Sequence, residues 1–92
     1  MFTKTYNEAT IEAVWRKGRI ISGYDQNIWR KDACGAWLNH DEHGNRNSKY
    51  GWEVDHIDPN GSDDLNNLQP LQWKNNVAKS DSRGSNYCVV FA

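Results

Sequence analysis

The chain has 92 residues, a formal net charge of −1 and 37% hydrophobic residues, with five Trp and four Tyr. This length fits one domain, and the aromatic content is too high for a disordered chain. No apolar run could span a membrane and residues 1–10 hold no apolar signal core, so we expect a cytoplasmic protein without a membrane partner. The near-neutral charge argues against strong binding of nucleic acid through surface charge alone.

The N-terminal half predicts one helix followed by little regular structure. In residues 7–18 the apolar positions recur at the spacing of an amphipathic helix, with Asn7 as N-cap and Gly18 as the C-terminal stop. Residues 33–39 predict a short strand, and residues 40–51 predict a polar connection.

The C-terminal half has a sharper pattern. Residues 51–57 alternate as a strand that places Trp52, Val54 and His56 on one face. The later segments are a loop at 58–64, a short extended segment at 65–71, a helix at 71–81 and, at 85–91, a last strand or a strip packed on the core. Pro70 is expected at or near the first turn of this helix.

Together these elements predict an α+β fold, a small single domain over residues 1–92. Its centre would be a hairpin-plus-helix unit at 51–81. Residues 1–50 would add an N-terminal helix, short strands and Trp-rich support, and residues 82–92 a C-terminal strip. A unit of about thirty residues cannot bury a core of its own, so we expect the N-terminal half to complete it.

The cysteines and two of the histidines are weaker candidates for chemistry. Cys34 and Cys88 form no Cys-x-x-Cys pair, and we expect two free, buried thiols, with a disulfide or a shared metal site as the alternative. His40 and His43 have a His-x-x-His spacing downstream of Cys34, which could form a second metal site. A contribution of these two histidines to a DNA site is also left open. Their polar surroundings and the lack of a fourth ligand argue against the metal site.

A stronger candidate is the pair Asp55 and His56, which strand packing alone does not require. Asn76 and Lys79 are three residues apart and share one face of the predicted helix. If that helix packs across the hairpin, the carboxylate of Asp55 and the amide oxygen of Asn76 form half of a site for a hard cation. The imidazole of His56 is then free to act as a base on water. Such a site would hydrolyse phosphodiesters.

The stretch EVDHIDPNGSDDLNNLQPLQWKNNVAKSD, residues 53–81, resembles the HNH endonuclease family with its ββα-metal motif. The resemblance rests on Asp-His, then Asn-Leu-Gln-Pro-Leu about a dozen residues later, then Asn-x-x-Lys. It implies a metal-dependent endonuclease that hydrolyses DNA and leaves 5′-phosphate and 3′-hydroxyl ends.

The resemblance also implies a role for each matching residue. His56 would be the general base, Asp55 and Asn76 metal ligands, Asn67 the residue that pins the long loop, and Lys79 a neighbour of the substrate phosphate. Spacing favours Asn67 and Asn76 for the motif positions, and their neighbours Asn66 and Asn75 remain the alternatives.

Two departures from the family pattern bear on the metal. Many family members have His at the third motif position, where this chain has Asn76. With Asn at this position the chain resembles the HNH domain of the RNA-guided DNA nucleases. A neutral oxygen ligand favours one Mg²⁺ or Mn²⁺ over Zn²⁺ or Ni²⁺. Gln72 and Asn75 occupy positions where many members carry cysteines of a zinc ribbon. We therefore expect no structural zinc, with aromatic packing in its place.

For partners, the sequence predicts DNA and no small-molecule cofactor. The candidate DNA contacts are Lys79, Lys74, Arg30 and Lys31. One motif per chain predicts a monomer that nicks one strand, with low sequence specificity because no base-reading helix is evident. The rival functions are a non-catalytic nucleic-acid-binding module on the same scaffold, an RNase, and a structural zinc protein. Restriction, phage DNA processing, mobile-element transfer and toxin activity all use this motif, so the biological role stays open.

Overall fold

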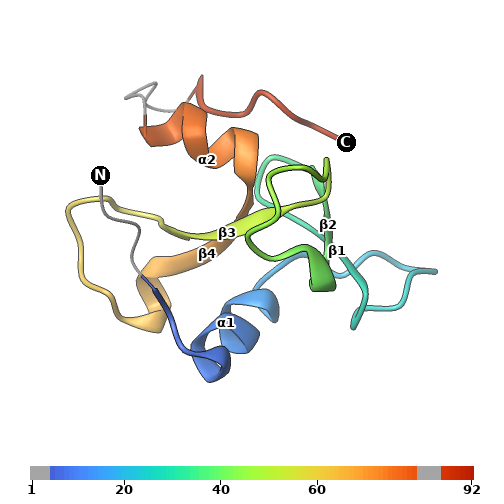
Figure 1. Ribbon diagram of the computed structural model, residues 1–92, viewed down its shortest axis with the longest axis horizontal. Helices are drawn as coiled ribbons and strands as arrows, with labels where there is room; N and C mark the ends of the chain where they lie inside the picture. Colours follow the sequence, from blue (N-terminus) through green and yellow to red (C-terminus); the bar gives the residue numbers. More distant parts are fainter. Residues whose placement is uncertain (1–4, 81–85) are drawn as a thin grey trace.

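The computed structural model describes residues 5–80 and 86–92 (Figure 1). Its elements, in chain order, are α1 (Glu8–Trp15), β1 (Trp29–Lys31), β2 (Trp37–Asn39), the 3₁₀ turn η1 (His40–Glu42), β3 (Trp52–His56), the 3₁₀ turn η2 (Leu65–Asn67), β4 (Leu68–Gln72) and α2 (Trp73–Ser80). Strand β1 pairs with β2, and β3 pairs with β4, both antiparallel. The predicted α+β class is confirmed. No helix within the described residues is long and apolar enough to cross a membrane.

The predicted hairpin and helix form as β3, β4 and α2. Pro70, however, lies in the middle of β4 and pairs with Val54, so its expected place in the first helical turn was wrong. Proline is tolerated there because β4 is an edge strand of a two-stranded sheet. The helix begins at Trp73, and the side-chain oxygen of Gln72 accepts the amide of Lys74 at 2.7 Å, which satisfies one free N–H of the first turn.

The N-terminal helix α1 begins where its sequence predicts. The side chain of Asn7 accepts a hydrogen bond from the amide of Thr10 at 2.8 Å, as an N-cap does. The helix ends at Trp15, before Gly18. Gly18 instead allows close packing, because a Cβ there would lie 3.0 Å from the Cβ of Arg30.

The core joins both halves of the chain. Its buried residues are Val14 and Trp15 of α1, Leu38 of β2, Trp52 of β3 and Leu68 of β4. The rings of Trp15 and Trp52 lie 5.4 Å apart, centroid to centroid. The N-terminal half therefore supplies the apolar surface that the hairpin and α2 lack, as expected.

A buried carboxylate ties the β1–β2 hairpin to α2. Asp32 is 2% exposed. One of its oxygens accepts the amides of Cys34 and Ala36, at 2.9 and 2.8 Å. The other accepts the amide of Gln72 at 2.9 Å and the side-chain N–H of Asn75 at 3.1 Å. Four donors therefore compensate for burying this charge.

The C-terminal strip is held by a side chain and a disulfide. The side-chain oxygen of Asn75 accepts the amides of Val89 and Val90, both at 2.8 Å. Cys34 and Cys88 form a disulfide, so the prediction of two free thiols was wrong. The two cysteines are 54 residues apart in the sequence, but their Cα atoms lie 5.4 Å apart in the fold.

No strand forms in the described residues 86–92, which make a strip against α2 rather than the alternative last strand. The end of the predicted hairpin-plus-helix unit and the start of the strip, residues 81–85, lie outside the described residues. The expectation that aromatic packing alone replaces a zinc ribbon was incomplete. Gln72 and Asn75 also belong to the buried network around Asp32.

His40 links η1 to α1. Its ring nitrogens contact the carboxylates of Glu12 and, at 3.1 Å, Asp41. Burial by itself lowers the pKa of His40, but the hydrogen bonds to Asp41 and Glu12 outweigh burial and raise that pKa above the ordinary 6.5. A histidine whose pKa is raised by folding stabilises the protein fully below pH 6.5, and this contribution is lost as the pH rises through the folded pKa.

Replacing His40 with Gln is therefore expected to lower the melting temperature more at pH 6 than at pH 8.5. Thermal unfolding followed by circular dichroism measures the difference between variant and wild type at each pH. His43→Gln is the matched control, because burial lowers the pKa of His43 and the sign of its pH dependence reverses. An equal loss for His40→Gln at both pH values would show that the charged form contributes nothing.

Candidate functional site

The candidate site lies between the β3–β4 hairpin and α2. Helix α2 packs across one face of the hairpin, and α1 lies on the other side (Figure 1). Residues of β3 alternate between these faces, so Trp52 enters the core beside α1 while Glu53 and Asp55 face α2. Asn76 and Lys79 of α2 meet these two carboxylates.

Asp55 is a buried carboxylate that contacts Gln69 and Lys79. The side-chain amide of Gln69, its partner across the hairpin, donates to it at 2.9 Å. The ammonium of Lys79 lies 3.3 Å from both carboxylate oxygens and donates to the backbone oxygen of His56 at 2.5 Å. The structure therefore brings Asp55 together with Lys79, and its direct neighbour is not Asn76.

Asn76 faces the same interface but binds Glu53. Its side-chain N–H donates to the Glu53 carboxylate at 2.9 Å. The guanidinium of Arg46 donates two further hydrogen bonds to Glu53, at 2.7 and 2.9 Å. Burial raises the pKa of Glu53, but the hydrogen bonds from Arg46 and Asn76 outweigh it and lower that pKa below the ordinary value. Asn76 and Asp55 are not hydrogen-bonded to each other.

Glu53 is one of the site residues that sequence analysis missed. The signal was present, because Glu53 stands two positions before Asp55 on a predicted strand and must share its face. The structure also separates Asn76 from its neighbour, since Asn75 is buried in the Asp32 network. Of the two asparagines, Asn76 is therefore the one that faces the interface with Glu53 and Asp55.

His56 points away from Asp55, toward the loop that follows β3. Its side chain is 26% exposed. The nitrogen Nε2 lies 2.6 Å from a carboxylate oxygen of Asp63 in this loop. Asp63, which no sequence argument singled out, therefore fixes the orientation of the ring and leaves Nδ1 as the other nitrogen for proton transfer.

Asn67 pins this loop as predicted. Its side-chain oxygen accepts the amide of Asp58 at 3.0 Å, and its N–H groups donate to the backbone oxygens of Asp58 and Ser62 at 3.0 and 2.8 Å. The contact is close enough that a Cβ at Gly61 would lie 2.7 Å from the side-chain nitrogen of Asn67. Asn67 thus acts on the site by holding the loop that carries Asp63.

Replacing Asn67 with Ala is expected to lower the free energy of unfolding by about 1 to 3 kcal/mol, because three hydrogen bonds of the loop are lost. Urea unfolding at neutral pH measures this loss. Asn66→Ala is the control, since Asn66 is an exposed neighbour of the same residue type. Equal stability of the two variants would remove Asn67 from its structural role.

Of the four predicted DNA contacts, Arg30 was wrong. It is 5% exposed, and its guanidinium donates to the backbone oxygens of Gln26, Arg16 and Gly18. These bonds hold the segment after α1 against β1, so Arg30 cannot reach a DNA strand.

The remaining predicted contacts differ in accessibility. Lys74 is exposed, with its ammonium 5.5 Å from the ring centre of Trp73. Lys31 is half-buried and lies over the ring of Trp37 at 4.6 Å. Lys79 is turned inward to Asp55.

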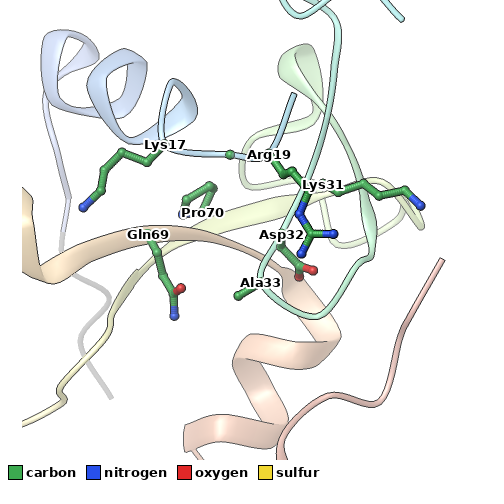
Figure 2. Close-up of a pocket in the computed structure, with 8 residues that line it drawn as sticks. Lys17, Arg19, Lys31, Asp32, Ala33, Gln69 and Pro70 are labelled. Carbon is green, nitrogen blue, oxygen red and sulfur yellow. The ribbon is translucent and has the colours of Figure 1, made fainter. Parts of the chain in front are cut away.

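A cavity of about 340 Å³ adjoins this site (Figure 2). It is lined by Lys17, Gly18, Arg19, Lys31, Asp32, Ala33, Gln69 and Pro70. The ammonium groups of Lys17 and Lys31 point in opposite directions, away from the space between them (Figure 2). The ammonium of Lys17 donates to the backbone oxygens of Leu65 and Leu68. Because both lysines are directed elsewhere, we place the candidate site at the hairpin and α2 rather than here.

The donor atoms around Asp55 determine which metal could fit. Among the described residues, no group of three or more His, Cys, Asp or Glu side chains is placed to hold a metal ion. Cys34 forms the disulfide, and the ring of His40 contacts carboxylates, among them that of Asp41. The second metal site considered for Cys34, His40 and His43 therefore does not form. The atoms near α2 are oxygens of Asp55, Glu53 and Asn76, which are ligands of hard cations. The ammonium of Lys79 already contacts Asp55, so the surroundings of this carboxylate accept a cation.

Comparison with protein-family models, with curated proteins and with solved structures finds no match for this chain.

Proposed function

We propose that the protein is a metal-dependent endonuclease of the HNH type that hydrolyses phosphodiester bonds of DNA. The main support is that Asp55, Asn76 and Lys79 lie in one interface while His56 stands beside it, held by Asp63. These are the motif positions that the resemblance to the HNH family marks. The proposal includes a monomer that nicks one strand with low sequence specificity.

In this mechanism, His56 takes a proton from the attacking water, and Asp63 holds the ring by accepting a hydrogen bond from its other nitrogen. Asp55 and the side-chain oxygen of Asn76 would hold Mg²⁺ or Mn²⁺. When bound, the cation polarises the scissile phosphate and stabilises charge on the leaving 3′ oxygen. Asn67 keeps the loop of Asp63 in place, and the bidentate Arg46 keeps Glu53 ionised beside Asn76.

The test is conversion of supercoiled plasmid DNA by the purified protein. We expect nicked circles before linear DNA with Mg²⁺ or Mn²⁺, and no conversion when EDTA removes the metal. Linear product at single-hit conditions would argue against a nicking monomer. DNA binding without any cleavage would favour the non-catalytic module, and cleavage of RNA but not of DNA would favour the RNase.

The cytoplasmic location inferred from the sequence stays a prediction. Disulfides persist mainly in oxidising compartments, and the cysteine pair of this fold is bridged. Trapping thiols during isolation and then counting free cysteines by mass spectrometry measures whether Cys34 and Cys88 are oxidised in the cell.

A further inference from the structure

Lys79 occupies the carboxylate of Asp55 and therefore bears on how a metal would bind there. Its side chain is 13% exposed, and its ammonium lies 3.3 Å from both oxygens of Asp55. It also donates to the backbone oxygen of His56 at 2.5 Å. The ammonium is therefore the counter-ion of the carboxylate that the proposed function assigns to a metal.

A lysine ammonium and a divalent cation at the same carboxylate repel each other, because both carry positive charge at contact distance. The ammonium of Lys79 lies against both oxygens of Asp55, so a metal that binds either oxygen competes with it. The flexible four-carbon chain of the lysine permits it to move away. The ring of Tyr87 lies 5.9 Å from the ammonium, and the displaced ammonium of Lys79 can make a cation–π contact with it.

We propose that Lys79 is an exchangeable counter-ion: it neutralises Asp55 in the metal-free protein, is displaced by the incoming cation and then turns to the phosphate of the bound DNA. This inference rests on the proposed function. It makes metal alone a weak ligand, since binding has to break the contacts of Lys79. A DNA phosphate receives the released ammonium, so DNA strengthens the binding of metal, and metal strengthens the binding of DNA.

The first experiment titrates Mn²⁺ into the DNA-free protein by calorimetry. Lys79→Met removes the competing charge, and we expect Mn²⁺ to bind about tenfold more tightly. Lys79→Gln retains a donor for the His56 carbonyl, and we expect an intermediate gain. It also provides a second readout if the Met variant folds poorly. Lys49→Met is the matched control, because this exposed lysine lies over Tyr50, and its removal should leave the Mn²⁺ affinity unchanged.

The second experiment measures DNA binding by fluorescence anisotropy in the inactive His56→Ala background with Mn²⁺ present. Adding Lys79→Met is expected to weaken DNA binding several-fold, since the released ammonium is missing. Tighter Mn²⁺ binding together with weaker DNA binding supports the exchange. Unchanged or weaker Mn²⁺ binding by folded Lys79→Met and Lys79→Gln overturns the exchange while leaving the nuclease proposal intact. Failure of the wild type and of both Lys79 variants to bind Mn²⁺ at millimolar concentration, with DNA as well as without it, overturns both.

Discussion

Replacing His56 with Ala is expected to slow DNA nicking at least about 100-fold, the usual contribution of a general base. The side chain is 26% exposed and contacts a loop residue, Asp63, so its loss should change the stability little. The binding of Mn²⁺ should persist, because the proposed ligands are Asp55 and Asn76 and the imidazole is not one of them.

The measurement is the rate at which supercoiled plasmid is nicked, with enzyme in excess over DNA and with Mg²⁺ or Mn²⁺. Asp63→Asn is the control, since asparagine keeps an oxygen for the ring of His56 but lacks the charge. We expect it to lose less activity than His56→Ala. Cleavage at the wild-type rate by His56→Ala would remove the imidazole from the mechanism.

Replacing Asp32 with Ala is expected to have the largest effect on stability, a loss of about 3 to 5 kcal/mol. The carboxylate is 2% exposed and accepts four hydrogen bonds. Alanine would leave the amides of Cys34, Ala36 and Gln72 and the side chain of Asn75 without their acceptor in a dry interior. Each unsatisfied donor carries a desolvation cost.

Urea unfolding of oxidised protein measures the change, with the disulfide intact in both samples. Asp25→Ala is the matched control, because this exposed carboxylate accepts one amide, that of Asn27 at 2.9 Å. We expect the control to lose about 1 kcal/mol or less. A similar loss for both variants would contradict the central role of Asp32. Nicking should fall in Asp32→Ala as well, because the network holds the start of α2, which carries Asn76 and Lys79.

This network braces the hairpin-plus-helix unit against the N-terminal half. The backbone amide of Gln72 and the side-chain N–H of Asn75 both donate to Asp32. The disulfide between Cys34 and Cys88 adds a covalent link between the same turn and the C-terminal strip. A closed loop of this kind stabilises the fold mainly by restricting the unfolded chain.

Several local elements could be predicted from the chain alone, although β1 (Trp29–Lys31) was not among them. Alternation over residues 51–57 marked β3, the three-and-four spacing after Asn7 marked α1, and the motif marked Asn67 as the residue that holds the loop. These features depend on neighbours two to four residues apart, or on one well-spaced motif. Such short-range patterns can be recognised in the sequence itself.

Which distant groups meet could be seen only once the chain was folded. In the folded chain Asp55 pairs with Lys79, and Asn76 binds Glu53. The guanidinium of Arg30 donates hydrogen bonds to backbone oxygens. The disulfide also joins Cys34 to Cys88 across 54 residues of chain. Partners of this kind are chosen by how α2 and the N-terminal half pack on the hairpin. No local periodicity encodes that packing, because every charged residue has several possible partners until the core brings one of them within reach.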